Sequence, residues 1–131
     1  HGLNNDLGFS DEDRKENIRR TTEVAKLFKD AGMVTFVTLI SPFEEARQAA
    51  KAAVGNGFME VYVKADLETC KSRDPKKLYE KALKGEIKSF TGIDSPYEIP
   101  KNPDLVLDTE LWSEEECAEA LYSAVVAKVK R

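Results

Sequence analysis

The residues best suited to bind a nucleotide lie near the start of the chain, where an aromatic ring, a guanidinium and a carboxamide are closely spaced. Phe9 precedes the expected start of a helix, and Arg14 and Asn17 are three residues apart on one face of it. Exposed backbone N–H groups at a helix amino end favour an anion. A nucleotide site fits this pattern, but so does a solvated helix face with Phe9 in the core, which the local pattern alone favours.

A second candidate group lies where an apolar run ends. Ile40 closes the run, and Ser41 follows it directly with Pro42 behind. If the run is a strand, Ser41 stands at the carboxyl edge of an α/β sheet, where ligands bind. A Ser-Pro turn before the next helix is an equally good interpretation, and the local pattern does not separate the two.

Cations beside aromatic rings recur in the second half of the chain. Arg73 and Lys76 lie on either side of an Asp-Pro turn, and Lys88 lies two residues before Phe90. Both groups suit a phosphorylated ligand that carries a ring. Because the lysines of this stretch alternate with glutamates, a solvated charged face is the alternative, and the pattern leaves both open.

Other chemistries find little support in the composition. His1 is the single histidine, so a histidine-based nucleophile or metal site is not expected, and no GxxxxGK[ST] phosphate loop occurs. A net charge of −4 with both signs interspersed predicts binding to neither nucleic acid nor a membrane surface. Cys70 and Cys117 lack a pairing or metal-ligand spacing, which fits a reducing compartment. With no signal or membrane-spanning segment in the sequence, we expect the cytoplasm.

Helices alternate with strands along the chain, which predicts an α/β domain with a mainly parallel sheet. Ser10 is the expected N-cap of the first helix, and Gly32 its left-handed end. Residues 88–103 are rich in Gly, Pro, Asp and aromatic residues and predict an ordered binding loop or lid. The expected helices cover residues 11–31, 44–54, 67–72, 75–83 and 114–130, and the expected strands residues 33–40, 58–63 and 105–107.

Several blocks of sequence closely resemble adenylylsulfate kinases, in the order and spacing of that family. The resemblance extends over residues 1–131, which we take as one partial kinase domain with a lid at about residues 73–97. It implies a P-loop-kinase-like three-layer α/β/α fold with a mainly parallel sheet. The blocks are HGLNNDLGFS at 1–10, DRKENIRR at 13–20, ISPF at 40–43, RDPK at 73–76 before Leu78 and Tyr79, and IKSFTGIDSPY at 87–97.

The resemblance also implies an activity, the transfer of phosphate from ATP to the 3′-hydroxyl of adenosine 5′-phosphosulfate (adenylylsulfate). The product is 3′-phosphoadenylylsulfate, an intermediate of sulfate assimilation. By this resemblance, Phe9 and Phe90 hold the substrate adenine between them. Arg14 and Asn17 bind the phosphosulfate and its surroundings.

The resemblance assigns the other positions as follows. Ile40 and Ser41 line the substrate pocket, and Ser41 stands where some members of the family carry a phosphate, although we expect direct transfer. Arg73 lies over the ATP adenine. Lys88 belongs to the mobile lid, contacts substrate and is, with Ser41, the expected catalytic residue.

The sequence departs from the family at its start. The family's phosphate loop, with its lysine and Mg²⁺-binding serine, and an Asp-Gly-Asp strand end precede the position of His1. The N-terminal strands of the fold are therefore missing from this sequence, which leaves two apolar strand edges unpaired. We expect one portion of a longer protein, in preference to a trimmed inactive descendant. ATP and Mg²⁺ are the expected cofactors, with no metal ligand among these residues.

Two other functions remain open at this point. A non-catalytic module would bind adenylylsulfate or its product without turning over ATP, and a different small-molecule kinase would use the same scaffold. By family resemblance we expect a homodimer, and a fused or associated ATP sulfurylase is left open.

Overall fold

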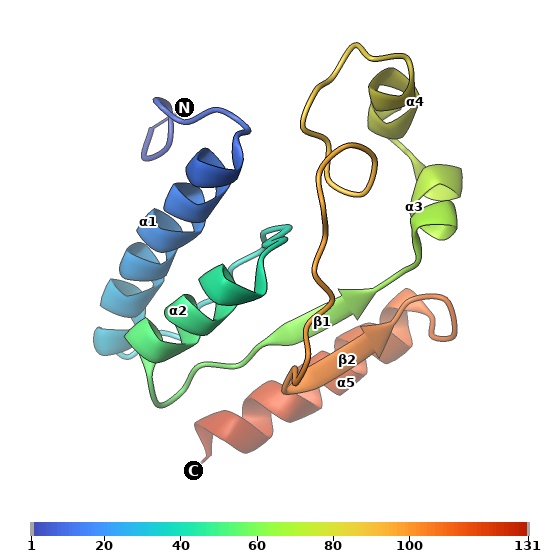
Figure 1. Cartoon of the computed structure of the whole chain (residues 1–131). Coiled ribbons are helices and arrows are strands. Elements are labelled where there is room, and N and C mark those ends of the chain that lie inside the picture. Colours follow the sequence, from blue (N-terminus) through green and yellow to red (C-terminus); the bar gives the residue numbers. More distant parts are fainter. Residues whose placement is uncertain (1, 131) are drawn as a thin grey trace. The chain divides into compact units, whose positions relative to one another are not determined.

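The computed structural model describes residues 2–130, within which the chain divides into two compact units that are described separately (Figure 1). The first unit runs up to residue 58 and includes residues 97–99, and the second comprises residues 59–96 and those from 100 onward. The elements are, in order, α1 (Asp11–Asp30), α2 (Glu44–Val54), β1 (Val61–Lys64), α3 (Leu67–Arg73), α4 (Leu78–Leu83), β2 (Leu105–Asp108) and α5 (Glu114–Val129).

Helix α1 begins and ends where local capping predicts. The Ser10 hydroxyl accepts a hydrogen bond from the backbone N–H of Asp13 at 3.1 Å. At the other end Gly32 has φ 84°, a conformation that glycine adopts without steric cost. Helix α2 likewise ends at Gly55, with φ 66°. Both predictions of bounds are thereby confirmed to within a residue.

The core of the first unit lies between α1 and α2, which run side by side in Figure 1 and contact each other along their length. Its buried residues are Ile18 from α1, and Phe43 and Ala46 at the start of α2. The turn before α2 is tied down by the segment of residues 97–99, because the Glu98 N–H donates to the carbonyl of the fully buried Pro42 at 2.8 Å. Helix α1 therefore packs on α2, whose start is fixed by this hydrogen bond.

The strand predicted at residues 33–40 is wrong. These residues form no helix or strand and all are exposed, including Phe36 at 64 % and Ile40 at 62 %. The composition indicated a strand covered on both faces, but a strand forms only where another strand pairs its backbone groups. Within residues 2–130 the sheet has two strands, β1 and β2, and neither pairs with this segment.

The second unit is built on the parallel pair of β1 and β2, in a register that sets Val61 opposite Leu105. Helix α5 packs against β2, whose Leu107 is 5 % exposed. The predicted strand at 58–63 is shifted, because pairing begins only at Val61 while Glu60 exchanges hydrogen bonds with Asp104. The predicted α/β class with parallel strands is confirmed.

Helix α4 starts later than predicted. The Asp74 carboxylate accepts hydrogen bonds from the backbone N–H groups of Leu78 at 2.8 Å and Glu80 at 3.1 Å. It satisfies the amino end of α4 from four residues upstream, so Pro75 lies in the turn and not in the first turn of the helix. The predicted helix start at residue 75 is wrong for this reason.

Helix α5 begins with the predicted capping box. The Glu116 N–H donates to the Ser113 hydroxyl at 3.2 Å, and the Ser113 N–H donates to the Glu116 carboxylate at 2.8 Å. Among the helices of residues 2–130, none combines the length and apolar character that crossing a bilayer requires.

Candidate functional site

Phe9 and Arg14, predicted to act together, are in contact in the first unit. Phe9 ends the amino-terminal loop and is 72 % exposed. The Arg14 Nε donates a hydrogen bond to the Phe9 carbonyl at 3.1 Å, and the guanidinium carbon lies 5.9 Å from the centre of the Phe9 ring. An open aromatic face with a cation at its side can stack a base and attract an anion attached to it.

The loop that carries Phe9 lies close against the first turn of α1. A Cβ added at Gly8 would stand 3.0 Å from the Asp13 carboxylate, so the approach depends on the absence of a side chain. The amino end of α1 is already complemented by Ser10 and by acids in its first turn, Asp11 and Glu12 among them. An anion in this region must therefore rely on Arg14, not on the helix end.

Asn17 lies one turn along α1 from Arg14, and both are half-buried. The Thr21 hydroxyl donates to the Asn17 carbonyl at 2.8 Å and lies 3.5 Å from its side-chain oxygen. Half-burial distinguishes both residues from a fully solvated helix face.

Ser41 occupies a tight turn before α2. It is half-buried with φ 45°, unusual for a residue other than glycine, and its carbonyl accepts a hydrogen bond from the Arg47 guanidinium at 2.6 Å. Neither interpretation of the Ser-Pro pattern is met in full, because no strand precedes Ser41, and α2 starts after Phe43 without a side-chain cap. Ile40, immediately before it, is exposed.

In the second unit, Phe90 lies in an ordered turn. The Asp94 carboxylate accepts hydrogen bonds from the backbone N–H of Ser89, at 2.8 Å, and of Phe90, while the Phe90 carbonyl accepts from Ser95 N–H at 3.1 Å. Ser89 has φ 55°. The Phe90 ring packs edge-on against Tyr79, with centroids 4.9 Å apart and planes at 74°. The irregular segment is thus an ordered loop, as predicted.

The two predicted cations of this unit are placed differently. Lys88 is exposed immediately before the Phe90 turn. Arg73, at the end of α3, donates to the hydroxyl of Thr109 at 2.8 Å and to its carbonyl at 2.7 Å. This contact ties α3 to the residue after β2, so Arg73 has a structural role as well as the one the resemblance implies.

The predicted site residues fall into two sets. Phe9, Arg14, Asn17, Ile40 and Ser41 belong to the first unit, and Arg73, Lys88 and Phe90 to the second. Each set contains one aromatic plate with one cation near it in the chain. An adenine held between Phe9 and Phe90 stays a prediction.

Sequence reasoning missed an ion-pair cluster beneath the Phe9 loop. The Arg20 guanidinium donates to both carboxylate oxygens of Asp6, at 2.6 and 2.8 Å, to the Leu3 carbonyl at 2.9 Å and to Glu16 at 2.8 Å. Arg19 and Arg20 together lower the pKa of Glu16 to about 2 by hydrogen bonding, and Arg20 lowers the pKa of Asp6. The only signal in the sequence is an acid in a turn segment before an arginine-rich helix, which is weak.

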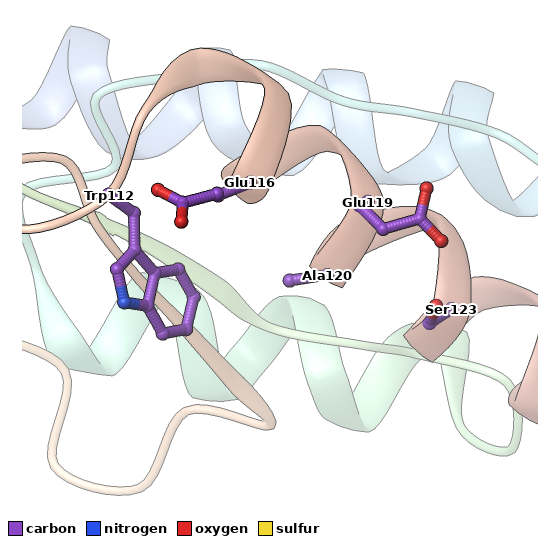
Figure 2. Close-up of a pocket in the computed structure, with 5 residues that line it drawn as sticks. All are labelled: Trp112, Glu116, Glu119, Ala120 and Ser123. Atoms are coloured by element: carbon purple, nitrogen blue, oxygen red, sulfur yellow. The ribbon is translucent and has the colours of Figure 1, made fainter.

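The surface hollows of the described residues are less suited to a nucleotide. One, of about 370 Å³, lies over α5, where Figure 2 shows the Glu116 carboxylate near the Trp112 ring and Glu119 farther along the helix. Another, of about 420 Å³, lies between α1 and α2 and is lined by alanines of α2, four glutamates and the cations Lys15 and Arg19. Neither hollow combines an aromatic ring with a cation, which is the combination that suits an adenine attached to a phosphosulfate.

Metal binding finds no ligand set in this part of the chain. Residues 2–130 hold no group of three or more His, Cys, Asp or Glu side chains that could coordinate an ion. The residues present therefore do not fit an all-protein Mg²⁺ site, and we derive no chemical step through the metal.

Comparison with known proteins connects both sets of residues to one family. The model of the family described as adenylylsulphate kinase matches residues 1–108. The adenylyl-sulfate kinase of Clostridium kluyveri is 52% identical over 130 residues, 99% of this chain and 65% of that protein. The adenylyl-sulfate kinase of Bacillus licheniformis is 58% identical over 131 residues, 99% of this chain and 66% of that protein. The chain thus spans about two thirds of the length of these relatives.

Solved structures lead to the same family. The Mycobacterium tuberculosis APS kinase CysC, solved in complex with AMPPNP and APS, matches with a TM-score of 0.87 and 47% identity, over 96% of this chain and 74% of that one. The crystal structure of APE1195 matches with a TM-score of 0.84 and 42% identity, over 98% and 73%. The predicted P-loop-kinase-like α/β class is confirmed by this likeness.

Proposed function

Since the chain belongs to the adenylylsulphate kinase family, we propose that it is the acceptor-binding part of an enzyme that phosphorylates adenylylsulfate on its 3′-hydroxyl. The donor is ATP and the product 3′-phosphoadenylylsulfate, which activates sulfate for assimilation. The observation that carries the proposal is the contact between the exposed Phe9 ring and the Arg14 guanidinium at the amino end of α1.

The geometry of this pair suits the two ends of adenylylsulfate. The adenine stacks on the open face of Phe9, and the phosphosulfate, which carries negative charge, pairs with Arg14 at the side of the ring. Asn17 and the Ser41 turn supply polar groups for the sugar and the anhydride. Fixing both ends of the substrate orients its 3′-hydroxyl, and phosphoryl transfer depends mostly on such positioning.

The second set of residues completes the proposed site. The Phe90 ring stacks on the other face of the adenine, and Lys88, two residues before it, supplies positive charge that stabilises the phosphoryl group during its transfer. Residues 73–97 form the lid, whose closure excludes water from the reacting groups. Arg73 stacks on the ATP adenine while its Thr109 contacts keep its plane fixed. We propose direct transfer between the nucleotides, with Ser41 as a pocket residue and not as an obligatory phosphate carrier.

ATP is proposed as donor because the similar Mycobacterium tuberculosis kinase was solved with AMPPNP and APS. Mg²⁺ is proposed with it, since a divalent ion neutralises the charge that develops on the phosphates. The roles proposed for residues 2–130 are binding of the acceptor and closure of the lid.

Compartment and partners are proposed from the cysteines and from the family. Cys70 and Cys117 are free thiols, half-buried, as in proteins of a reducing compartment, and we propose the cytoplasm. A homodimer and an associated or fused ATP sulfurylase are proposed from the family resemblance alone.

Calorimetric titration with adenylylsulfate, with and without Mg-ADP, tests the proposed function. We expect binding by the parent chain, a loss of about tenfold or more in affinity for Phe90→Ala, because base stacking on an aromatic ring is worth about 1–3 kcal/mol, and none for Tyr122→Ala. Tyr122 is the matched control, an aromatic residue of α5 that is 65 % exposed.

The outcomes separate the alternatives. Binding that tightens with Mg-ADP supports a kinase with an ATP site. Binding that is indifferent to Mg-ADP supports a non-catalytic adenylylsulfate module. Binding that survives Phe90→Ala points to a different acceptor and kinase, and no binding by a folded parent chain overturns the site.

A further inference from the structure

We propose that Asp6 and Arg20 are positioning residues for the nucleotide: their ion pair holds the amino-terminal loop against α1, so that Phe9 is fixed before the substrate arrives. The inference rests on the proposed function, because it names what prepares that same site. Neither residue touches the proposed position of the substrate, and both act through Phe9.

The contacts gathered on Arg20 are those of an anchor. Its side chain is 24 % exposed, although it belongs to a surface helix. One guanidinium holds both oxygens of Asp6, the carbonyl of Leu3 and, through Nε, the carboxylate of Glu16. Bidentate pairing of this kind has a fixed geometry, unlike a single contact between mobile surface charges.

Between Gly2 and Phe9 the loop is exposed except at the half-buried Asn4 and Leu7. Its own turns are closed by two backbone hydrogen bonds of 3.2 Å, from Asn5 to Gly2 and from Leu7 to Asn4. Phe9 is 72 % exposed and is not one of the buried residues that form the core of its unit. Its position therefore depends on Arg14 at one end of the loop and on Arg20 at the other.

Holding the loop before binding raises affinity. A mobile loop must be ordered when the ligand stacks on it, and that entropy is subtracted from the binding free energy. With Asp6 and Leu3 already held by Arg20, the ordering is complete in the unbound protein. The free energy of stacking between Phe9 and the adenine then contributes to affinity without a cost for ordering the loop.

Arg19 offers a matched control on the same helix. It donates to both oxygens of Glu16, at 2.7 and 2.8 Å, and these hydrogen bonds stay within α1, while its side chain is 60 % exposed. Arg19→Gln thus removes the same charge from the same acid as Arg20→Gln, while the loop keeps its anchor. Any difference between the two variants reports the contact with Asp6 and Leu3.

The first measurement compares adenylylsulfate affinity and amide hydrogen exchange in the full chain. We expect Arg20→Gln and Asp6→Asn each to weaken binding about tenfold, the equivalent of about 1.4 kcal/mol. Exchange at residues 3–9 of the unbound protein should accelerate in both, with α1 unchanged. Arg19→Gln should match the parent in both measurements. Asp6→Asn, in an exposed loop, keeps the test valid if Arg20→Gln fails to fold.

A double-mutant cycle with Phe9→Ala separates positioning from general stability. If Arg20 acts through Phe9, Arg20→Gln costs no further affinity once the ring is absent, whereas a merely structural loss would be additive. If Arg20→Gln and Asp6→Asn both bind like the parent, or if their losses add to that of Phe9→Ala, the inference is overturned while the proposed function stands. If the parent chain fails to bind adenylylsulfate, both the proposed function and the role of the Asp6–Arg20 ion pair in binding are overturned.

Discussion

The two aromatic residues proposed to hold the adenine are supported in opposite ways. Phe9 is held by an ion pair that joins the loop to a helix, in which Arg20 lies 14 positions after Asp6. Phe90 is held by a local turn, in which the Asp94 carboxylate reaches back to backbone groups four and five residues earlier. Phe9 is 72 % exposed, whereas Phe90 is half-buried against Tyr79.

This contrast shows how the same task depends on different forces. Ion pairs between exposed side chains respond to salt and to pH, because water and counter-ions compete for each charge. A carboxylate bonded to two backbone N–H groups in one turn depends on that side chain and on the backbone angles around it. Changes of charge, salt or pH should therefore alter the order of the Phe9 loop, whereas substitutions that alter backbone angles should alter the Phe90 turn.

The largest effect is expected from Asp94→Ala, which removes the acceptor of two backbone hydrogen bonds in the Phe90 turn. Hydrogen bonds to a charged group are worth about 1.5–3 kcal/mol, so adenylylsulfate affinity should fall by at least about tenfold. Asp94→Asn keeps an acceptor oxygen and should retain part of the affinity. Calorimetric titration measures both.

Glu86→Ala is the control for this variant, since it removes an exposed carboxylate from the same segment of the chain. It should bind like the parent. Equal losses of adenylylsulfate affinity in Glu86→Ala and Asp94→Ala would show that net charge, and not the turn, sets the affinity. The proposed difference between the supports of Phe9 and Phe90 would then be wrong.

A smaller effect is expected from glycines with positive φ in the two regions. Gly92, in the Phe90 turn, has φ 86°, and a Cβ there would lie 3.1 Å from the Leu67 side chain. Gly2 has φ 87° with nothing within 4 Å of a Cβ. Gly92→Ala should lose about 1–2 kcal/mol of stability, because L-residues are strained in this region. Gly2→Ala should lose less, because its added Cβ meets no atom within 4 Å and Gly2 precedes the residues that Arg20 holds.

Thermal unfolding of the two variants checks this difference. A loss for Gly2→Ala as large as for Gly92→Ala would mean that the amino-terminal loop is as conformationally constrained as the turn. The distinction between a charge-held loop and a backbone-held turn would then disappear.

The smallest effect concerns the titration of the acids under the Phe9 loop. The pKa of Asp6 is lowered from its ordinary 3.8, and that of Glu16 from 4.5 to about 2. A carboxyl whose pKa is lower in the folded state stabilises the fold above its unfolded pKa and loses that contribution as the pH falls. The ion pair of Asp6 with Arg20 should thus be complete above the ordinary pKa of 3.8 and be lost as the pH falls through the lowered pKa of Asp6, whereas the contribution of Glu16 is lost between about pH 4.5 and about pH 2.

Carboxyl-carbon NMR shifts during an acid titration measure this directly. In Arg20→Gln the pKa values of both Asp6 and Glu16 should rise, whereas in Arg19→Gln only that of Glu16 should rise. High salt, about 1 M with a Debye length of about 3 Å, should speed exchange in the Phe9 loop and leave the Phe90 turn unchanged. A pKa of Asp6 that does not move in Arg20→Gln would contradict the ion pair.

Features that depend on neighbouring residues were predicted well. The Ser10 cap, the glycine ends of α1 and α2 and the capping box of α5 each require only residues within one turn of a helix. The pairing of Phe9 with Arg14 was within reach for the same reason, since the two are five residues apart. Such interactions can be predicted from the sequence because both partners lie within a few residues of each other.

Predictions failed where a distant or unexpected partner decides. Residues 33–40 have the composition of a buried strand, but composition does not provide the second strand that pairing needs. Pro75 suits the first turn of a helix, yet the Asp74 carboxylate satisfies the helix end from outside and moves the start to Leu78. Arg20 and Asp94 carried no recognisable motif, because an ion pair or a turn contact leaves no periodic pattern.

The sequence by itself determined the helices, the locally capped ends of α1, α2 and α5, the family, and the residues that its motifs assign to the nucleotide. Only the tertiary structure decided that β1 pairs with β2, that residues 33–40 lie unpaired among residues 2–130, and that Arg20 anchors the loop of Phe9. The physical reason is range: a cap or a turn is closed within a few residues, whereas a strand pair or an anchoring ion pair exists only once the chain has brought separated groups together.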